Sequence, residues 1–481
     1  MAIRVLDVLN FSNRRNPGAD SGIQLQKELI TAILRKRPDF FFYLLVPREM
    51  KSSLQDAFRG KNVQLIPASF LARQQGGAYQ FDVRELSRLL DLDRIDVDAL
   101  FLNQPELTPG FLDFFNKVHF FDVHSFGYIH WMDWKKLNQR KNRWNLPGNL
   151  AILTSILLSA VTGCNSLYGK QRILREAARW FNPETLAELN SKLVPLWPGI
   201  NWPEIRKART AERHRVATII FPFRTQTYTG FKSLVEIHLA KLWRKRRDFR
   251  LILTNPSDYD YVKHYPQHFP FIQVCRLDRA EYLRTLWMAD VVVACHTGAS
   301  QWSLAVVEAI AAECIPLLNK EGFLPELLLE AIPVRQRPEV LARHFYFRSE
   351  FGRRLEAILD NLPVERQRIK VLSRHVRRFY DWGNRVDDWI RCLEFADRAA
   401  QPPTQSTQVL QKIERLIAQQ HSCSKDAILR HLNWHTKSHQ ICWTRYRHYL
   451  RRHFWEDPRL PVVVFADDRL GAPTPPQSVE I

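Results

Sequence analysis

The stretch from residue 289 to residue 327 restricts the possible folds of this chain most strongly. A short apolar segment (291–294) is followed by a polar loop (296–301), then by the pattern of an amphipathic helix with an inward glutamate (304–313). A second apolar segment (314–318) then leads into a glycine-containing loop (321–326). Strand, helix and strand in this order form a βαβ unit. Because open parallel sheets bind ligands at the carboxyl ends of their strands, the two loops also predict a ligand site.

Alternating strand and helix patterns occur in two series along the chain. Strands of the first series are expected at residues 3–9, 40–46, 63–67, 99–103, 118–123, 158–162 and 193–197. Strands of the second series are expected at residues 216–223, 249–254, 271–275, 291–294 and 315–318. A chain of 481 residues is too long for one ordinary core. The sequence therefore predicts an α/β fold with two parallel, doubly wound sheets.

The segments between and after these series predict the domain organisation. Residues 194–201 contain proline and glycine and are expected to be a linker, which gives an N-terminal domain at 1–198 and a second domain at 199–369. The composition changes after residue 400, where 401–407 resembles a linker. Helical patterns at 408–419, 424–432 and 444–454 then predict a small helical C-terminal domain at residues 408–470.

The charge is strongly positive, with 70 Lys and Arg against 50 Asp and Glu and a net charge of +20. Such an excess favours a polyanionic partner or an anionic membrane face. Residues 421–455 contain seven Lys or Arg residues, one acidic residue and interleaved aromatic side chains. They predict a helix-turn-helix-like module that binds nucleic acid, and the alternative is a small cap with a solvated basic face. The expected phosphate contacts are Arg445, Arg447, Arg451 and Arg452.

Other features argue against a secreted, membrane-spanning or metal-dependent protein. Seven scattered cysteines without a C-x-x-C pair show no disulfide or zinc pattern, which favours the cytoplasm. The N-terminus lacks a secretory signal, and the apolar run at 150–163 is too short to span a bilayer. We interpret the D-x-D string at 96–98 as a solvated turn, so no metal is expected.

The helix pattern S-L-A-V-V-E-A-I-A-A-E-C-I-P at 303–316, followed by a glycine loop that ends in Glu326, resembles the donor motif of GT-B glycosyltransferases. The likeness is greatest to the large retaining family, the family-4-like enzymes, and segment 194–201 resembles their interdomain hinge. This resemblance implies two Rossmann-like domains facing across a cleft, with the acceptor on the first and a nucleotide sugar on the second. It also implies a helix at about 370–399 that crosses back onto the first domain, and no cofactor besides the nucleotide-sugar co-substrate.

The resemblance also implies the residues that hold the donor. Glu308 would accept hydrogen bonds from the ribose hydroxyls. Ser300, beside Gln301, stands where the family has a glutamate that contacts the sugar. Arg224 would contact the diphosphate, whereas Lys232 stands about three residues late and is alternatively a solvated helix residue. The loop residues expected at the sugar and phosphates are Gly322, Phe323 and Glu326.

Candidate acceptor-side residues lie in the first domain. His124 follows the strand expected at 118–123 and could act in acid–base chemistry, with a structural loop histidine as the alternative. A similar order of strand and histidine occurs in the queuosine-tRNA mannosyltransferase family, and Asn165 matches a later position in the same family. Gly22 would let ligands approach the start of the first helix, and Asp20 is a candidate acceptor base.

Charge and resemblance together predict an enzyme that transfers a sugar from a nucleotide-sugar donor to a base in nucleic acid. The favoured acceptor is a hydroxymethylated pyrimidine in DNA, as in phage-type DNA glycosylation. Alternatives are modified tRNA and a cell-surface or lipid-linked glycan. A non-catalytic binding protein on a transferase scaffold is a further alternative, since Ser300 and Lys232 depart from the family pattern.

Overall fold

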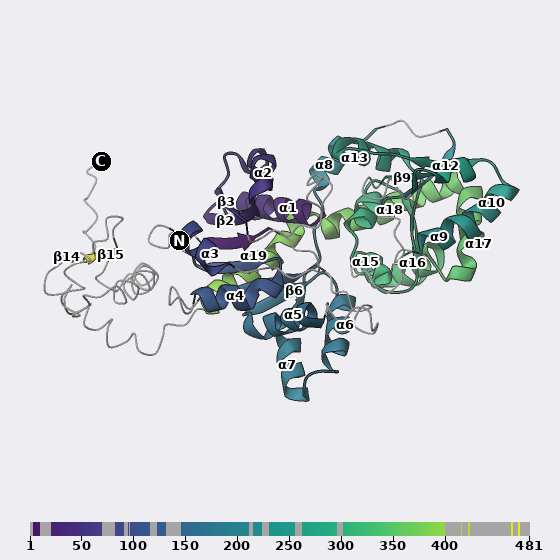
Figure 1. Cartoon of the computed structure of the whole chain (residues 1–481). Helices are drawn as coiled ribbons and strands as arrows, with labels where there is room; N and C mark the ends of the chain where they lie inside the picture. The colour runs from purple at the N-terminus through teal and green to yellow at the C-terminus, as the bar shows by residue number, and fades with distance from the viewer. Residues whose placement is uncertain are drawn as a thin grey trace, which may run out of the picture.

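The computed structural model describes most of the first 399 residues and a few positions in the tail. The described residues are 3–9, 21–69, 82–90, 95, 97–115, 123–130, 146–210, 215–223, 230–254, 262–295, 302–399, 415, 422–423, 463–464 and 470–471. Two parallel sheets, each covered by helices, make up the body of the protein (Figure 1).

The first sheet has seven strands in the order β3-β2-β1-β4-β5-β6-β7, and all of its pairings are parallel. Its strands are β1 (Ile3–Val8), β2 (Phe40–Pro47), β3 (Val63–Ala68), β4 (Ala99–Leu102), β5 (Ser125–Ile129), β6 (Val161–Cys164) and β7 (Leu193–Pro195). Its helices are α1 (Ser21–Lys36), α2 (Lys51–Phe58), α3 (Val83–Leu89), α4 (Thr108–Asp113), α5 (Leu146–Leu158), α6 (Leu167–Ala177) and α7 (Pro183–Lys192). The order reverses between β1 and β4, the place where such sheets bind ligands.

The second sheet has the order β10-β9-β8-β11-β12-β13 and is also parallel. Its strands are β8 (Ala217–Phe221), β9 (Phe249–Leu253), β10 (Ile272–Val274), β11 (Val291–Ala294), β12 (Ile315–Asn319) and β13 (Phe345–Tyr346). Its helices are α8 (Trp202–Lys207), α9 (Phe231–Ser233), the π-helical η8 (Leu234–Leu239), α10 (Ala240–Lys245), α12 (Tyr265–His268), α13 (Arg279–Met288), α14 (Leu304–Ala311), α15 (Leu324–Leu329), α16 (Arg337–His344) and α17 (Phe351–Asp360).

Two long helices return the chain from the second sheet to the first. Helix α18 (Leu362–Tyr380) packs on α14, whereas α19 (Trp382–Ala399) packs on α1 and β4, and Figure 1 shows α19 in green beside the first sheet. The break lies at Asp381, which forms a parallel bridge with Ile200 of the linker. Gly199 makes room there, because an added Cβ would lie 2.4 Å from the Trp382 ring.

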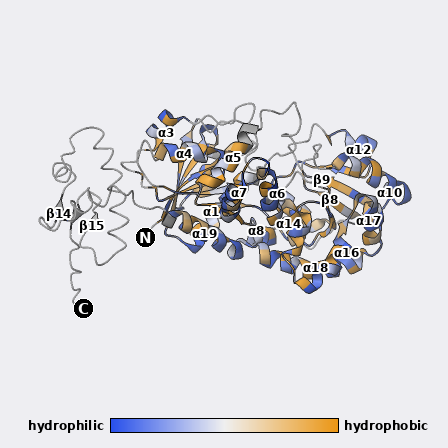
Figure 2. Cartoon of the chain, turned by 90° about the horizontal axis from the view of Figure 1, so that it is seen from below, coloured by the Kyte–Doolittle hydropathy of each residue, from blue (hydrophilic) through white to orange (hydrophobic). Residues whose placement is uncertain are grey.

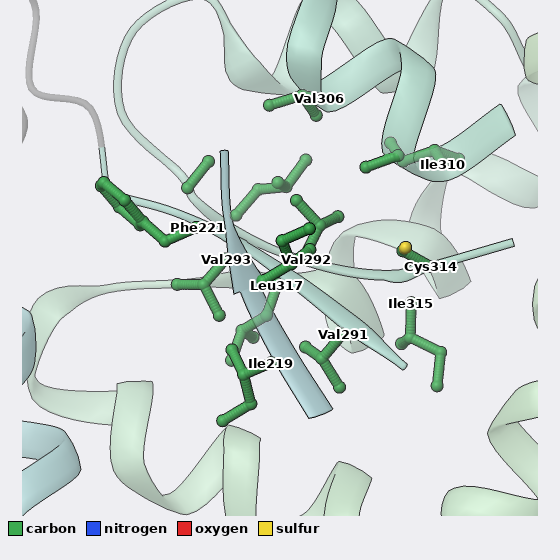
Figure 3. Close-up of a cluster of buried hydrophobic side chains, with 14 of the residues drawn as sticks. Ile219, Phe221, Val291, Val292, Val293, Val306, Ile310, Cys314, Ile315 and Leu317 are labelled. Carbon is green, nitrogen blue, oxygen red and sulfur yellow. The ribbon is translucent and has the colours of Figure 1, made fainter. Parts of the chain in front are cut away.

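Apolar side chains on the strands and helices form the cores. Figure 2 shows the hydrophobic residues in orange on the strands and along parts of the surrounding helices. The strands of the βαβ unit are buried along their whole length, as expected for parallel strands covered on both faces. Val306 and Ile310 of α14 belong to the same buried cluster as Ile219 and Val292 (Figure 3). Ser303 caps α14, because its hydroxyl accepts a hydrogen bond from the Val306 N–H.

Several predicted boundaries differ from the structure. The strand expected at 118–123 is wrong at its described end, because Val123 and His124 precede β5, which begins at Ser125. The strand expected at 158–162 begins only at Val161, because α5 continues to Leu158. The three helices expected in the tail lie almost entirely outside the described residues. The tail positions that are described include the short antiparallel strands β14 (Ser422–Cys423), β15 (Val463–Val464) and β16 (Leu470–Gly471).

Within the described residues, no helix is both long enough and apolar enough to cross a membrane. The described cysteines at positions 164, 275, 295, 314 and 392 are all free thiols.

Candidate functional site

The carboxyl ends of the two sheets meet at the contact between α15 and α6. Glu326 of α15 follows β12, and the amino end of α6 follows β6. The Glu326 carboxylate accepts hydrogen bonds from the backbone N–H groups of Leu167 and Tyr168, both at 2.6 Å. Because both elements begin just after the carboxyl end of a strand, this contact brings together the edges that bind ligands in parallel sheets.

Glu326 also accepts a hydrogen bond from the Trp197 indole N–H of the linker at 2.9 Å. The first N–H groups of a helix lack partners within the helix, and Glu326 satisfies two of them while Ser166 Oγ satisfies that of Gly169. Burial raises the pKa of Glu326, and the hydrogen bonds from Tyr168, Leu167 and Trp197 oppose that rise. The structure thus places this carboxylate in the contact between the two halves, and a donor contact by Glu326 remains a prediction.

Glu308 lies on the side of α14 that faces away from the second sheet. It is two residues from both Val306 and Ile310, which is about 200° around a helix. Its side chain is buried, with 6% of the residue exposed. The charge is compensated by Arg279, whose Nη2 donates a hydrogen bond to Glu308 Oε1 at 2.6 Å. The Tyr282 hydroxyl also forms a hydrogen bond with Glu308.

Arg279 contacts two further carboxylates. It is the first residue of α13, a helix that begins with a capping box formed by Asp278 and Glu281. Its Nη2 lies 3.3 Å from Glu204 Oε2 on α8 and 3.8 Å from Glu28 Oε1 on α1. The carboxylates of Glu28, Glu204 and Glu308 thus approach one guanidinium, the first from α1 of the first domain and the other two from α8 and α14 of the second.

Glu28 is anchored within the first half of the molecule. Its carboxylate accepts hydrogen bonds from Gln24 Nε2 at 2.6 Å and from the Trp382 indole N–H at 2.9 Å. Burial raises its pKa to about 7; Arg279 opposes this rise and Glu308 adds to it. A carboxyl with this pKa exchanges its proton near neutral pH, and such groups gather at functional sites.

The other described donor candidates lie at the same edge of the second sheet. Gly322 has a φ of +78°, a left-handed conformation that favours glycine, in the loop between β12 and α15. The neighbouring Phe323 is buried in the core at 1% exposure, so its backbone rather than its ring could contact a ligand. The Lys232 side chain is 72% exposed and lies 3.9 Å from Glu236, as in an ordinary solvent-facing helix pair.

The structure changes the interpretation of the first-domain histidine. His124 precedes β5, and its backbone carbonyl accepts a hydrogen bond from Leu100, so it lies at the amino edge of the sheet. His130 follows β5 directly and lies at the carboxyl edge, beside the end of β6. His124 therefore lies at the amino edge of the sheet rather than at the expected carboxyl edge, whereas His130 lies at the carboxyl edge.

Asn165 is at the edge expected for an acceptor-side residue. It follows β6, is 3% exposed, and its Nδ2 donates a hydrogen bond of 2.5 Å to the His130 carbonyl. The His130 ring packs edge-on against Tyr128 with ring centroids 4.9 Å apart. Gly22 is in the first turn of α1, after the carboxyl end of β1. The ends of β1, β5 and β6 thus bring Gly22, His130 and Asn165 to one edge of the first sheet.

The remaining predicted site residues lie outside the described part of the chain: Asp20, Arg224, Ser300, Gln301, Arg445, Arg447, Arg451 and Arg452. Sequence reasoning missed His130 because the glycine and serine of β5 obscured that strand. It also missed Arg279, although an arginine within the N-cap pattern D-x-x-E at 278–281 is visible in the sequence.

Neither a protein-family profile nor a curated protein sequence matches this chain. Solved structures do match over most of its length. A glycosyltransferase from Rickettsia africae has 13% identity and a TM-score of 0.55, with 82% of this chain and 98% of that chain covered. Sucrose-phosphate synthase from Thermosynechococcus elongatus has 12% identity and a TM-score of 0.58, with 83% and 100% covered.

Anabaena HepE, solved with UDP and glucose, has 12% identity and a TM-score of 0.54, with 82% of this chain and 99% of that chain covered. These matches include both parallel sheets, whose carboxyl ends meet between α6 and α15. The chain therefore has the α/β architecture of the GT-B glycosyltransferases, with two Rossmann-like domains.

Proposed function

We propose that this chain transfers a sugar from a nucleotide-sugar donor held by the second sheet to an acceptor held by the first. The observation that carries the proposal is the buried Glu308 on the helix of the βαβ unit. The loop that follows this unit contains Gly322, whose backbone has a left-handed conformation. The HepE structure contains UDP and glucose, and the Arabidopsis starch synthase IV structure contains ADP and acarbose. These ligands support a nucleoside diphosphate as the leaving group of the reaction.

In this proposal Glu308 accepts hydrogen bonds from the ribose hydroxyls of the donor. The backbone of the Gly322 loop approaches the sugar and phosphates, because glycine leaves no side chain in the way. Cationic side chains compensate the diphosphate as its bond to the sugar breaks. The residues proposed for the diphosphate are Arg224 and Lys232, and those for the sugar hydroxyls are Ser300 and Gln301.

On the acceptor side, His130 is the candidate for hydrogen bonding or proton transfer at the reacting sugar. The acceptor oxygen forms a bond to the anomeric carbon, the diphosphate leaves with the electron pair of the broken bond, and the departing diphosphate takes up the proton of the acceptor hydroxyl. Asn165 holds the His130 carbonyl at 2.5 Å and so fixes the backbone that carries the ring. We propose retention of the anomeric configuration and no role for a metal ion.

The donor proposal is tested with Glu308→Gln and a panel of UDP- and ADP-sugars. A charge-assisted hydrogen bond contributes about 1.5–3 kcal/mol, so the variant should bind its donor about 10- to 100-fold more weakly. Calorimetry measures the affinity, and thermal unfolding checks that the fold is intact. Equal affinity in variant and wild type, at equal stability, would reject Glu308 as a ribose ligand.

For the acceptor we propose a base in nucleic acid, with a hydroxymethylated pyrimidine in DNA favoured. The net charge of +20 and the basic, aromatic segment 421–455 support this choice, because phosphate neutralisation dominates nucleic-acid affinity. Mass spectrometry of nucleosides from DNA and tRNA, after incubation with the protein and a donor panel, distinguishes the candidates. A hexose adduct on a tRNA nucleoside alone would select tRNA, and no adduct on either would favour a glycan acceptor.

A non-catalytic binding protein is the second candidate, because Ser300 stands where the resembled family has glutamate. The two candidates differ in one measurement. An enzyme of this kind releases nucleoside diphosphate from the correct nucleotide sugar, whereas a binding protein retains the intact donor.

A further inference from the structure

Arg279 holds together a group of carboxylates between the two halves of the chain. Its Nη2 lies 2.6 Å from Glu308 Oε1, 3.3 Å from Glu204 Oε2 and 3.8 Å from Glu28 Oε1. These carboxylates come from α14, α8 and α1, which are distant in sequence. Three acidic groups around one guanidinium leave an excess of negative charge when all are ionised, which favours hydrogen-bond donors as additional partners.

Burial and hydrogen bonding decide which carboxylate depends on Arg279. Glu308 is 6% exposed and Glu28 is 8% exposed, whereas the Glu204 side chain is 35% exposed and can be hydrated. Glu28 receives two hydrogen bonds from residues other than Arg279, namely Gln24 and Trp382. Glu308 makes the shortest of the three contacts, and its charge is compensated by Arg279. The orientation of the Glu308 carboxylate therefore depends on this arginine more than that of its neighbours does.

We propose that Arg279 is a positioning residue that holds the Glu308 carboxylate for the ribose hydroxyls of the donor, an inference that rests on the function proposed above. Arg279 and Tyr282 both lie on α13, so this helix sets the direction of the carboxylate. A carboxylate has about four lone-pair positions, and two contacts leave room for the vicinal hydroxyls of a ribose. The planar guanidinium suits this role, because its donors point in fixed directions.

The same guanidinium connects the donor side with the first domain. Glu28 lies on α1, and its partner Trp382 begins α19, which also packs on α1. A shift of α1 relative to α13 changes the distance between Glu28 and Arg279 and thereby the charge around Glu308. The 3.8 Å contact between Glu28 and Arg279 thus links the first domain to the groups that surround Glu308.

The test compares Arg279→Gln, Arg279→Lys and the control Arg284→Gln, an exposed arginine on the same helix. For the glutamine variant, the donor KM should rise about 10- to 100-fold while kcat changes less than about threefold, because oriented binding is lost rather than a reacting group. The lysine variant keeps the positive charge but lacks the several fixed N–H donors of the guanidinium. Its donor KM should therefore lie between the values for the wild type and for Arg279→Gln. The control should match the wild type.

A donor KM within about twofold of wild type in Arg279→Gln, together with reduced thermal stability, would overturn the positioning role. If Arg279→Gln does not fold, the test is made with Arg279→Lys. An unchanged donor KM in that variant would then overturn the proposal. Glu308→Gln is measured alongside. If Glu308→Gln also leaves donor affinity unchanged, the proposed function of the site fails, whereas an impaired Glu308→Gln with normal Arg279 variants rejects only the role of Arg279.

Discussion

Replacing Glu326 with glutamine should weaken the contact between the two halves of the molecule. The carboxylate accepts hydrogen bonds from the N–H groups of Leu167, Tyr168 and Trp197 at 2.6, 2.6 and 2.9 Å. In Glu326→Gln one oxygen becomes an NH₂ group that faces an N–H donor, and the negative charge at the amino end of α6 is lost. Hydrogen bonds to charged groups contribute about 1.5–3 kcal/mol each.

One such bond is lost and the others weaken, so we expect a loss of roughly 2–4 kcal/mol in the free energy of unfolding. That loss should lower Tm by roughly 5–10 °C in calorimetry. The matched control is Glu321→Gln, an exposed glutamate in the loop just before α15, which should leave Tm within about 1 °C of wild type. Equal Tm values for the two variants would show that the hydrogen bonds to Glu326 do not stabilise the contact between the two halves. A normal Tm with a raised donor KM would instead make Glu326 a donor ligand, as the sequence predicted.

Three further predictions concern pH, the diphosphate and the tail. Burial raises the pKa of Asp7 to about 8, against hydrogen bonds from Gln26 and Val8, and the unfolded value is 3.8. Between these two pKa values the folded state keeps a proton that the unfolded state loses, so the free energy of unfolding should fall as the pH rises from 4 to 8. Urea titrations at several pH values measure this decline. Asp7→Asn should flatten that decline, and an unchanged slope would contradict the assignment. Arg224→Ala should reduce turnover more than Lys232→Ala, whose side chain is 72% exposed, and equal large losses would place Lys232 at the diphosphate. Deleting residues 408–481 should lower DNA affinity but spare donor hydrolysis, and full-length binding with ~6 phosphate contacts should weaken on the order of 10³-fold from 50 to 200 mM salt. Unchanged DNA binding by the truncated protein would remove the role of the tail.

Local sequence patterns correctly predicted the strands that are covered on both faces. The strands 291–294 and 315–318 are continuous apolar runs, and the structure has them as β11 and β12. The helix between them shows its N-cap serine and its single glutamate in the sequence. These features are local, because a strand covered on both faces must be apolar along its whole length. The second sheet and the position of Glu308 could therefore be predicted.

Tertiary structure decided where side chains from distant segments meet. Strand β5 (Ser125–Ile129) contains Gly127, where an added Cβ would lie 3.2 Å from Thr162 Oγ1, so glycine suits the tight packing against the neighbouring strand β6. Glycine is also a common turn residue, and the local pattern therefore did not indicate a strand here. The sequence pattern therefore drew attention to His124 at the amino end of β5, and not to His130 at its carboxyl end.

The contacts of Glu28, Arg279 and Glu326 likewise depend on how the two halves dock. The bond between Trp382 and Glu28 spans 354 positions, and the bonds from Glu326 to α6 span 159 and 158. No local periodicity encodes such pairs, because each partner looks like an ordinary helix residue in its own segment. Local patterns in the chain were enough to predict the two sheets and the buried position of Glu308. Only the docking of the two halves decided which groups surround that residue.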